Sequence, residues 1–176
     1  MRSAGTTDSN TAESGLVQMT TAQKQFFDKI LPAVQQVSQK KGIVTSVMLA
    51  QTILESAWGT SQLATNANNV FGIKADVSWS GNSYTVSTKE VENGKAVTVE
   101  RQFRAYQSLF ESIADYGNFF TSTAWRTKNY ASFLQATNYE IAITSLLASG
   151  YATDPAYAEK LKPLIQRYGL DQYDVN

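Results

Sequence analysis

Residues 44–59, VTSVMLAQTILESAWG, constrain the fold of this chain more than any other stretch. As a helix, this segment carries apolar side chains on nearly every side. A helix without a broad polar face is normally buried in the middle of a domain. We therefore expect a central helix that ends at Gly59, with the other elements packed around it. The apolar positions are Val47, Met48, Leu49, Ala50, Ile53, Leu54, Ala57 and Trp58.

Glu55 is the one carboxylate in this apolar segment. Ionising a carboxyl group in apolar surroundings is costly, so its pKa should rise and it can hold a proton near neutral pH. Glu55 is therefore a candidate general acid. The alternative is a glutamate at a helix end whose carboxyl group reaches water, since perturbed groups gather at functional sites only as a tendency.

Length and composition exclude several classes of protein. The 176 residues suit one domain with a proper core, and the 15 acidic and 15 basic side chains balance, so no strong field favours nucleic acid or an anionic membrane. Histidine and cysteine are absent, which excludes Ser-His-Asp and thiolate catalysis and makes a zinc site improbable. Acid–base chemistry must then depend on Asp, Glu, Lys or Tyr. No apolar run approaches the length of a membrane span, and the N-terminus lacks the pattern of a secretory signal.

Residues 1–18 are small, polar and almost free of aromatic side chains, which predicts a disordered leader or linker remnant before a single domain over 19–176. A first helix should follow an N-cap at Thr20 or Thr21 and end near Gly42. Pro32 lies within its apolar pattern and is expected to kink it.

Residues 84–103 carry the clearest hairpin signal. Asn93 and Gly94 lie between alternating residues, as expected of a two-residue type I′ turn. Pairing Glu92 with Lys95 then sets the register. One face would hold Tyr84, Val86, Glu90, Val97, Val99 and Phe103, and the other Thr85, Ser87, Lys89, Thr98, Glu100 and Gln102.

In this register Glu90 alone interrupts the apolar face, whereas Glu100 lies on the polar face and Glu92 beside the turn. Glu90 is therefore a candidate second functional carboxylate. The alternative is an edge residue near the hairpin tip that faces water. A slip of one residue would exchange the two faces.

The rest of the chain is predicted to be helical. Residues 66–69 form a turn-rich loop after the central helix, and helices are expected over 108–120, 129–136 and 139–148. A final helix should begin at Pro155, with Asp154 as its cap, and run to Tyr168. The predicted architecture is a mainly α domain with one small β insertion.

Five strings, AQTILESAWG, NNVFGIKA, STKEVENGK, FRAYQSLFESIADY and SGYATDPAYAEKL, resemble the glucosaminidase domain of glycoside hydrolase family 73. They occur in order between residues 20 and 168. This resemblance implies an α+β, mainly α, lysozyme-like fold in which a small β-hairpin lobe forms one side of the cleft.

The resemblance also implies roles for particular residues. Glu55 corresponds to the general acid of the family and Glu90 to its second carboxylate, and Tyr151 resembles the active-site tyrosine that binds or orients the sugar. Asn69 and Phe71 resemble residues that line the cleft.

From the residues alone, the aromatic side chains could have packing roles instead of roles in the site. Tyr151 can instead pack beside the Asp154 cap. Phe71 is an apolar aromatic of the kind that usually packs in a core rather than forming a sugar platform. Trp58 can do either, and the core is favoured.

The implied function is a peptidoglycan hydrolase, an endo-β-N-acetylglucosaminidase that cuts the β-1,4 bond between N-acetylglucosamine and N-acetylmuramic acid. Glycosidic cleavage needs a protonated acid at the leaving oxygen and usually a second carboxylate, which fits Glu55 and Glu90. A muramidase or lytic transglycosylase on the same fold, and a non-catalytic wall-binding or phage-tail domain, remain alternatives.

The resemblance further implies peptidoglycan glycan strands as the partner, with no nucleic acid or membrane, no metal and no organic cofactor. We expect a monomer of bacterial or phage origin, either secreted or associated with the cell wall.

Overall fold

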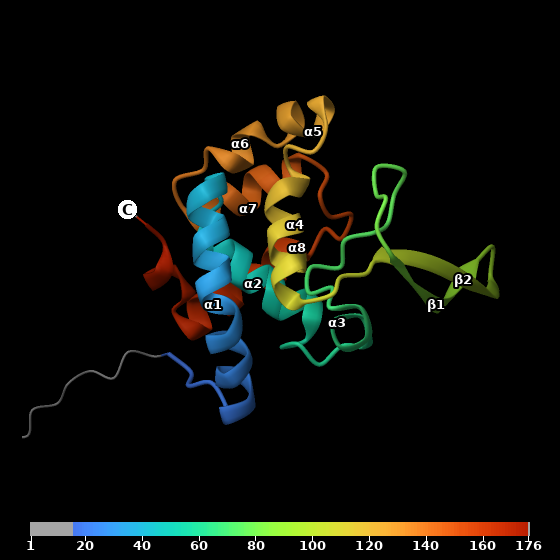
Figure 1. Ribbon diagram of the computed structural model, residues 1–176, viewed down its shortest axis with the longest axis horizontal. Coiled ribbons are helices and arrows are strands. Elements are labelled where there is room, and N and C mark those ends of the chain that lie inside the picture. The colour runs from blue at the N-terminus through green and yellow to red at the C-terminus, as the bar shows by residue number, and fades with distance from the viewer. Residues whose placement is uncertain (1–15, 176) are drawn as a thin grey trace, which may run out of the picture.

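The computed structural model describes residues 16–175, and shows a helical body from which a β-hairpin projects (Figure 1). Most of the expected leader over 1–18 lies outside the described residues. Near its end, the backbone N–H of Val17 donates to the Arg167 carbonyl at 2.9 Å. This hydrogen bond lies before the expected boundary at residue 19, although the Val17 side chain is exposed.

Helix α1 (Thr21–Lys41) begins and ends as the sequence predicts. Thr20 is the N-cap and forms a capping box with Gln23, in which each side chain accepts from the backbone N–H of the other. Gly42 closes the helix in the left-handed conformation, with φ at 73°. The helix continues through Pro32 as a single element, since helical residues flank the proline on both sides.

Helix α2 (Thr45–Ser56) is the central helix that the apolar pattern predicts, and nearly all its residues are buried. It packs against α1 and against three elements from the C-terminal part of the chain. The expected end at Gly59 is wrong, because Ala57 and Trp58 both adopt the left-handed backbone conformation and stop the helix at Ser56.

The segment after α2 differs from the expected loop. Helix α3 (Gln62–Ala67) occupies its first part, since the Ser61 side chain accepts from the Ala64 N–H and starts a new helix. Asn68 ends it in the left-handed conformation. The predicted loop over 66–69 therefore begins inside a helix.

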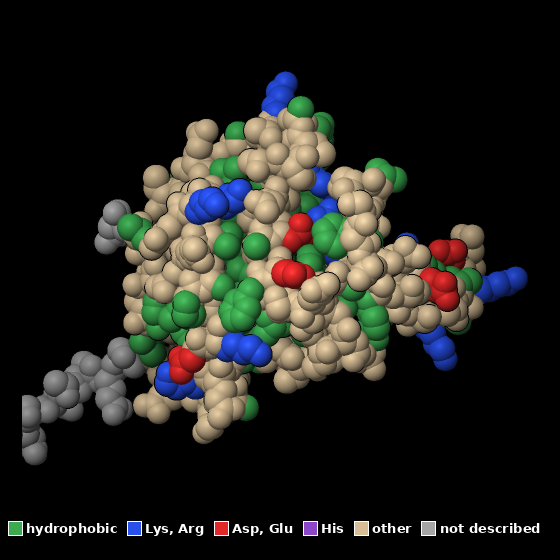
Figure 2. Space-filling view, in the orientation of Figure 1, with side chains coloured by type: hydrophobic (Ala, Val, Ile, Leu, Met, Phe, Trp, Pro, Cys, Tyr) green, Lys and Arg blue, Asp and Glu red, His purple; other side chains and the backbone are tan. Residues whose placement is uncertain are grey.

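The hairpin has the predicted register. Strands β1 (Ser83–Glu92) and β2 (Lys95–Arg104) pair antiparallel, with Glu90 opposite Val97. Asn93 and Gly94 both have positive φ, as a type I′ turn requires. The hairpin extends away from the helices, and its outer part carries both acidic and basic side chains (Figures 1 and 2).

The remaining helices are α4 (Leu109–Phe119), α5 (Ala124–Asn129), α6 (Ala131–Leu134), α7 (Tyr139–Ala148) and α8 (Tyr157–Tyr168), followed by the 3-10 helix η1 (Leu170–Tyr173). Helices α4 and α7 match their predictions. The single helix expected over 129–136 is instead two short ones, and the first begins earlier because Thr123 caps it. Helix α8 begins at Tyr157 rather than Pro155, and Asp154 accepts from the Ala156 N–H in the turn before it.

One core joins these elements around α2. Its largest fully buried aromatic side chains are Tyr116, Phe120 and Phe133, all from the helical part of the chain that follows the hairpin. The fold is therefore mainly α with one small antiparallel sheet, as predicted. None of the described helices combines the length and the apolar character that crossing a membrane would need.

Candidate active site

Glu55 lies where two adjoining cavities meet. Their volumes are about 370 and about 510 Å³. The residues common to both cavities are Glu55, Lys74, Tyr151, Ala152 and Tyr157. The first cavity is also lined by aromatic side chains, among them Phe119 and Tyr130. Glu55 therefore lines both cavities, and the two together are called the groove below.

The surroundings of Glu55 favour its protonated form. The side chain projects from the last turn of α2 and is partly buried, and burial raises the pKa of its carboxyl group. A hydrogen bond that Tyr157 donates to its Oε1, at 3.2 Å, and the positive charge of Lys160 both act in the opposite direction but do not cancel this rise. This direction agrees with the sequence prediction for Glu55.

Tyr151 borders both cavities and packs among other aromatic rings. Its ring centroid lies 5.9 Å from that of Phe120 and 6.5 Å from that of Tyr157. Burial raises the pKa of its hydroxyl well above the usual range, so Tyr151 is a hydrogen-bond donor beside Glu55 at any working pH. These positions support the predicted site role.

Phe71 is both a core residue and a residue that lines the cleft, the two alternatives left by the sequence. Only 3% of its surface is exposed and its ring stacks on Tyr116, with 3.9 Å between centroids, as in a core residue. It also forms part of the wall of the first cavity. Trp58 packs against the core with its ring edge-on to Tyr168.

The expectation that Asn69 lines the cleft is wrong. Asn69 is fully buried, and it is absent from the residues that line these two cavities in the described part of the chain. Its Nδ2 donates to the carbonyls of Ile73 and Arg104, and its Oδ1 accepts from the N–H of Gly72 at 2.9 Å. Because all these partners are backbone groups, Asn69 shapes the loop that faces Glu55.

The structure does not bring Glu90 into this groove. Among residues 16–175, those that line the two cavities do not include Glu90. Its carboxylate instead pairs with Arg101 at 3.3 Å, with 40% and 45% of the two side chains exposed. Arg101 lies opposite Val86 and thus shares the face of Glu90, a neighbour that the sequence reasoning did not consider.

Sequence reasoning missed Asp76, a carboxylate that does line the first cavity with Glu55. Burial pushes the pKa of Asp76 up, but hydrogen bonds from Ser78 and Arg126 outweigh it and lower the pKa to about 2. Asp76 is therefore ionised and a weak base. Its partner Arg126 is fifty residues away along the chain, on α5, so no local sequence signal marks the pair.

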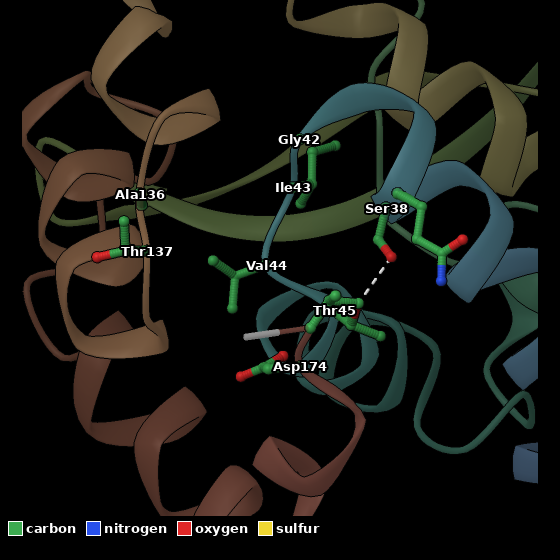
Figure 3. Close-up of a pocket in the computed structure, with 10 residues that line it drawn as sticks. Ser38, Gly42, Ile43, Val44, Thr45, Ala136, Thr137 and Asp174 are labelled. Atoms are coloured by element: carbon green, nitrogen blue, oxygen red, sulfur yellow. Dashed lines mark hydrogen bonds between the residues drawn. The ribbon is translucent and has the colours of Figure 1, made fainter.

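Another cavity, of about 490 Å³, lies where α1 passes into α2 (Figure 3). Three of its polar side chains are used within the fold: Ser38 bonds to Thr45 at 2.8 Å, and Asp174 accepts from the backbone N–H and the hydroxyl of Ser46. Asp174 thereby caps the start of α2, where the N-cap residue Val44 provides no side-chain cap. We assign this cavity a structural role.

No described group of three or more acidic side chains is arranged to hold a metal ion. The predicted lack of a cofactor stays a prediction.

Comparisons with known proteins place this geometry in a family. Residues 31–170 match the glucosaminidase family, described as mannosyl-glycoprotein endo-beta-N-acetylglucosaminidase. The exo-glucosaminidase LytG of Bacillus subtilis is 43% identical over 86% of this chain and 54% of its own length. The peptidoglycan hydrolase FlgJ of Salmonella typhimurium is 37% identical over 82% of this chain and 46% of its own length. The chain thus spans about half the length of these relatives.

Solved structures agree. The catalytic domain of the autolysin Auto from Listeria monocytogenes superposes with a TM-score of 0.76 at 34% identity, covering 90% of this chain and 91% of that one. A glycoside hydrolase domain of Salmonella typhimurium FlgJ gives a TM-score of 0.68 at 37% identity, covering 84% of this chain and 97% of that one. The chain therefore belongs to the glucosaminidase family of glycoside hydrolases and has its lysozyme-like fold.

Proposed function

We propose that this chain is a peptidoglycan hydrolase that cleaves the β-1,4 bond between N-acetylglucosamine and N-acetylmuramic acid within glycan strands. The observation that carries the proposal is a carboxyl group with a raised pKa, Glu55, at the junction of two cavities with aromatic walls. The names of two relatives, peptidoglycan hydrolase and autolysin, support peptidoglycan as the substrate.

In this proposal Glu55 is the general acid. Its proton passes to the glycosidic oxygen as the bond to the leaving sugar breaks, which removes the need to expel an alkoxide. The cavities on its two sides offer room for a sugar on each side of the bond that is cut. Tyr151, which borders both of them, is placed to donate a hydrogen bond to the sugar at the cleavage point.

The second carboxylate is assigned to Glu90. Asp76 is nearer to the acid in the first cavity, but its pKa of about 2 and its arginine partner leave it a poor base. For Glu90 to reach the cleavage point, the hairpin must move over the bound substrate. Its exposed ion pair with Arg101 lies within the hairpin and does not tie it to the body, and freeing the carboxylate from this pair costs little, since such pairs contribute only about 0–1 kcal/mol. If the N-acetyl group of the substrate itself assists, Glu90 orients that group.

A muramidase is the second candidate. A probable N-acetylmuramidase of Lactococcus lactis is 36% identical over 88% of this chain. A muramidase would cut the other glycosidic bond of the strand, the one that leaves N-acetylmuramic acid at the new reducing end. A non-catalytic wall-binding domain is disfavoured, because such a module does not need a protonated carboxyl group in a groove.

We propose that the chain acts as a monomer, secreted or associated with the cell wall, on peptidoglycan strands rather than on nucleic acid or membranes. The balanced charge argues against nucleic acid and anionic membranes as partners, and the absence of histidine and cysteine argues against a zinc site. We further propose that the chain needs no metal or organic cofactor.

Mass spectrometry of fragments released from purified peptidoglycan tests the proposal. A new reducing end at N-acetylglucosamine is expected, whereas N-acetylmuramic acid there indicates a muramidase and an anhydro sugar indicates a transglycosylase. Long fragments early in digestion indicate internal cleavage, and single units released from strand ends indicate exo action, as in the name of LytG. No release by wild type, under conditions in which another wall hydrolase works, would contradict the proposal.

A further inference from the structure

Three buried side chains form a hydrogen-bonded row that ends on Glu55. Tyr116 on α4 donates to Gln51 Oε1. Gln51 Nε2 donates to the hydroxyl of Tyr157 at 3.0 Å, and Tyr157 on α8 donates to Glu55 Oε1 at 3.2 Å. Gln51 and Glu55 are four residues apart and so share one face of α2. The row therefore ties the carboxyl group to three helices of the core.

The direction of this row follows from Tyr116, which is fully buried. In the described part of the chain, Gln51 Oε1 is the acceptor for its hydroxyl proton. The opposite orientation of the Gln51 amide would leave that buried proton unpaired, at a cost of about 1–3 kcal/mol. With the amide in the observed orientation, the hydroxyl proton of Tyr157 points at Glu55.

The two oxygens of Glu55 therefore have different surroundings. Oε1 is already the acceptor for Tyr157. Oε2 faces Gly72, where a Cβ atom would lie only 3.4 Å from it. Gly72 lines the first cavity and has φ at 67°, a conformation that favours glycine. The absence of a side chain there leaves Oε2 open on the side of the groove.

We propose that Tyr157, held by Gln51 and Tyr116, is a positioning residue that keeps the acidic proton of Glu55 on Oε2, the oxygen beside Gly72 at the groove. A protonated carboxyl group has one oxygen that carries hydrogen and one that only accepts. Because Tyr157 occupies the accepting oxygen, the hydrogen is left on the oxygen that a substrate can reach. This inference rests on the proposed role of Glu55 as the general acid.

The same hydrogen bond assists the proton transfer. After Glu55 gives up its proton, Oε1 belongs to a carboxylate, and hydrogen bonds to charged groups are stronger than those to neutral ones. Tyr157 therefore stabilises the product of the transfer more than the starting acid. The accepted bond from Gln51 strengthens Tyr157 as a donor, since hydrogen bonds in a chain polarise one another.

Tyr157→Phe removes this hydroxyl and keeps the ring. We expect kcat for peptidoglycan to fall roughly tenfold, a part of what a general acid contributes, with KM little changed. The alkaline limb of the kcat profile should move to higher pH, because the lost hydrogen bond was lowering the pKa of Glu55. A purely structural role for Tyr157 would not move this limb.

A second readout does not depend on activity. The carboxyl carbon of Glu55, followed by NMR in protein labelled with ¹³C-glutamate and assigned with Glu55→Gln, should titrate at higher pH in Tyr157→Phe than in wild type. Tyr173→Phe is the matched control, since it removes the same atom from a tyrosine that packs on Phe27 with 5.5 Å between ring centroids. Both readouts should stay at wild-type values in this control.

A folded Tyr157→Phe protein in which neither the Glu55 titration nor the alkaline limb moves would overturn the inference. If that variant does not fold, Tyr116→Phe loosens the row from its far end and should give a smaller shift in the same direction; an unchanged titration there overturns it equally. Activity retained by Glu55→Gln would instead refute the general-acid proposal, which the NMR titration of the tyrosine variants does not test.

Discussion

Two carboxylates, Glu55 and Glu90, lie in contrasting regions of this molecule. Glu55 projects from the most buried helix and accepts a hydrogen bond from the core. Glu90 lies on a two-stranded ribbon that projects from the body, and its partner Arg101 is exposed to a similar extent (Figure 1). The fold thus sets the position and pKa of the first group, whereas the second is held only within its own hairpin.

The hairpin is attached to the body at its base. Lys74 forms an isolated β-bridge with Phe103, and the N–H of Ala75 donates to the Gln102 carbonyl at 3.0 Å. A two-stranded hairpin is marginally stable by itself, so the end that carries Glu90 can bend while the base stays in place. Under the proposed mechanism, this site combines an acid fixed in the core with a second carboxylate that reaches the cleavage point only when the hairpin bends over substrate.

The largest expected effect is that of Glu55→Gln. This change keeps the shape of the side chain but cannot deliver a proton, so peptidoglycan cleavage should fall by about 10²–10⁴-fold or more. Because a raised folded-state pKa makes the ionised carboxyl destabilising above its unfolded pKa, the variant should be as stable as wild type or slightly more stable at neutral pH. Zymograms and thermal unfolding measure the two effects, and a variant that unfolds readily would show that Glu55 is structural.

Glu90→Gln tests the proposed role of the carboxylate on the projecting hairpin. We expect turnover to fall roughly tenfold or more with the fold intact, since the hairpin is exposed and the change removes one charge. Glu100→Gln and Glu92→Gln are the matched controls on the same ribbon and should be nearly silent. Because the register is fixed by the structure, damage from Glu100→Gln would mean that the second carboxylate is misassigned.

The contribution of the Asp76 charge to stability can be tested by its dependence on pH. Its folded-state pKa of about 2 is below the ordinary value of 3.8, so the ionised group stabilises the fold above pH 3.8 and this contribution is lost as the pH falls through about 2. Asp76→Asn should therefore lower the unfolding temperature at pH 6 and have little effect near pH 2. Asp28→Asn, which removes an exposed partner of Lys24, should have little effect at pH 6. Equal losses for Asp76→Asn at both pH values would contradict the role of its charge.

The smallest expected effect is that of chelators and thiol reagents. A site built from carboxyl groups and tyrosines in a chain without histidine or cysteine should keep its full activity in both. If a chelator abolishes the activity and a divalent ion restores it, the site contains a metal ion. The roles described for Glu55 and Glu90 would then both be wrong.

Features set by local sequence were predicted well. The burial of α2 followed from its apolar pattern, and the hairpin register followed from Asn93 and Gly94, whose backbone conformation dictates the turn. The Thr20 cap is equally local. The starts of α3 and α5 were missed because each begins at a single cap, Ser61 or Thr123, in a segment without a repeated apolar pattern.

The parts of the site that depend on distant contacts were not predicted. Gln51 meets Tyr116 and Tyr157 across 65 and 106 positions, so nothing local indicates the row behind Glu55. Asn69 was expected in the cleft because it resembles residues that line the cleft in the family. A polar residue next to a site can either bind substrate or hold the backbone, and only the packed structure separates the two.

The claim that Glu55 supplies the proton is tested most directly by changing the leaving group. Natural strands expel a sugar hydroxyl that needs a proton, whereas an aryl glycoside of an N-acetylglucosamine oligomer expels a phenolate that needs little help. We predict that Glu55→Gln loses nearly all cleavage of the natural strand and retains most of its rate on the aryl glycoside. Equal losses on both substrates, in a folded variant, would contradict the assignment of Glu55 as the general acid.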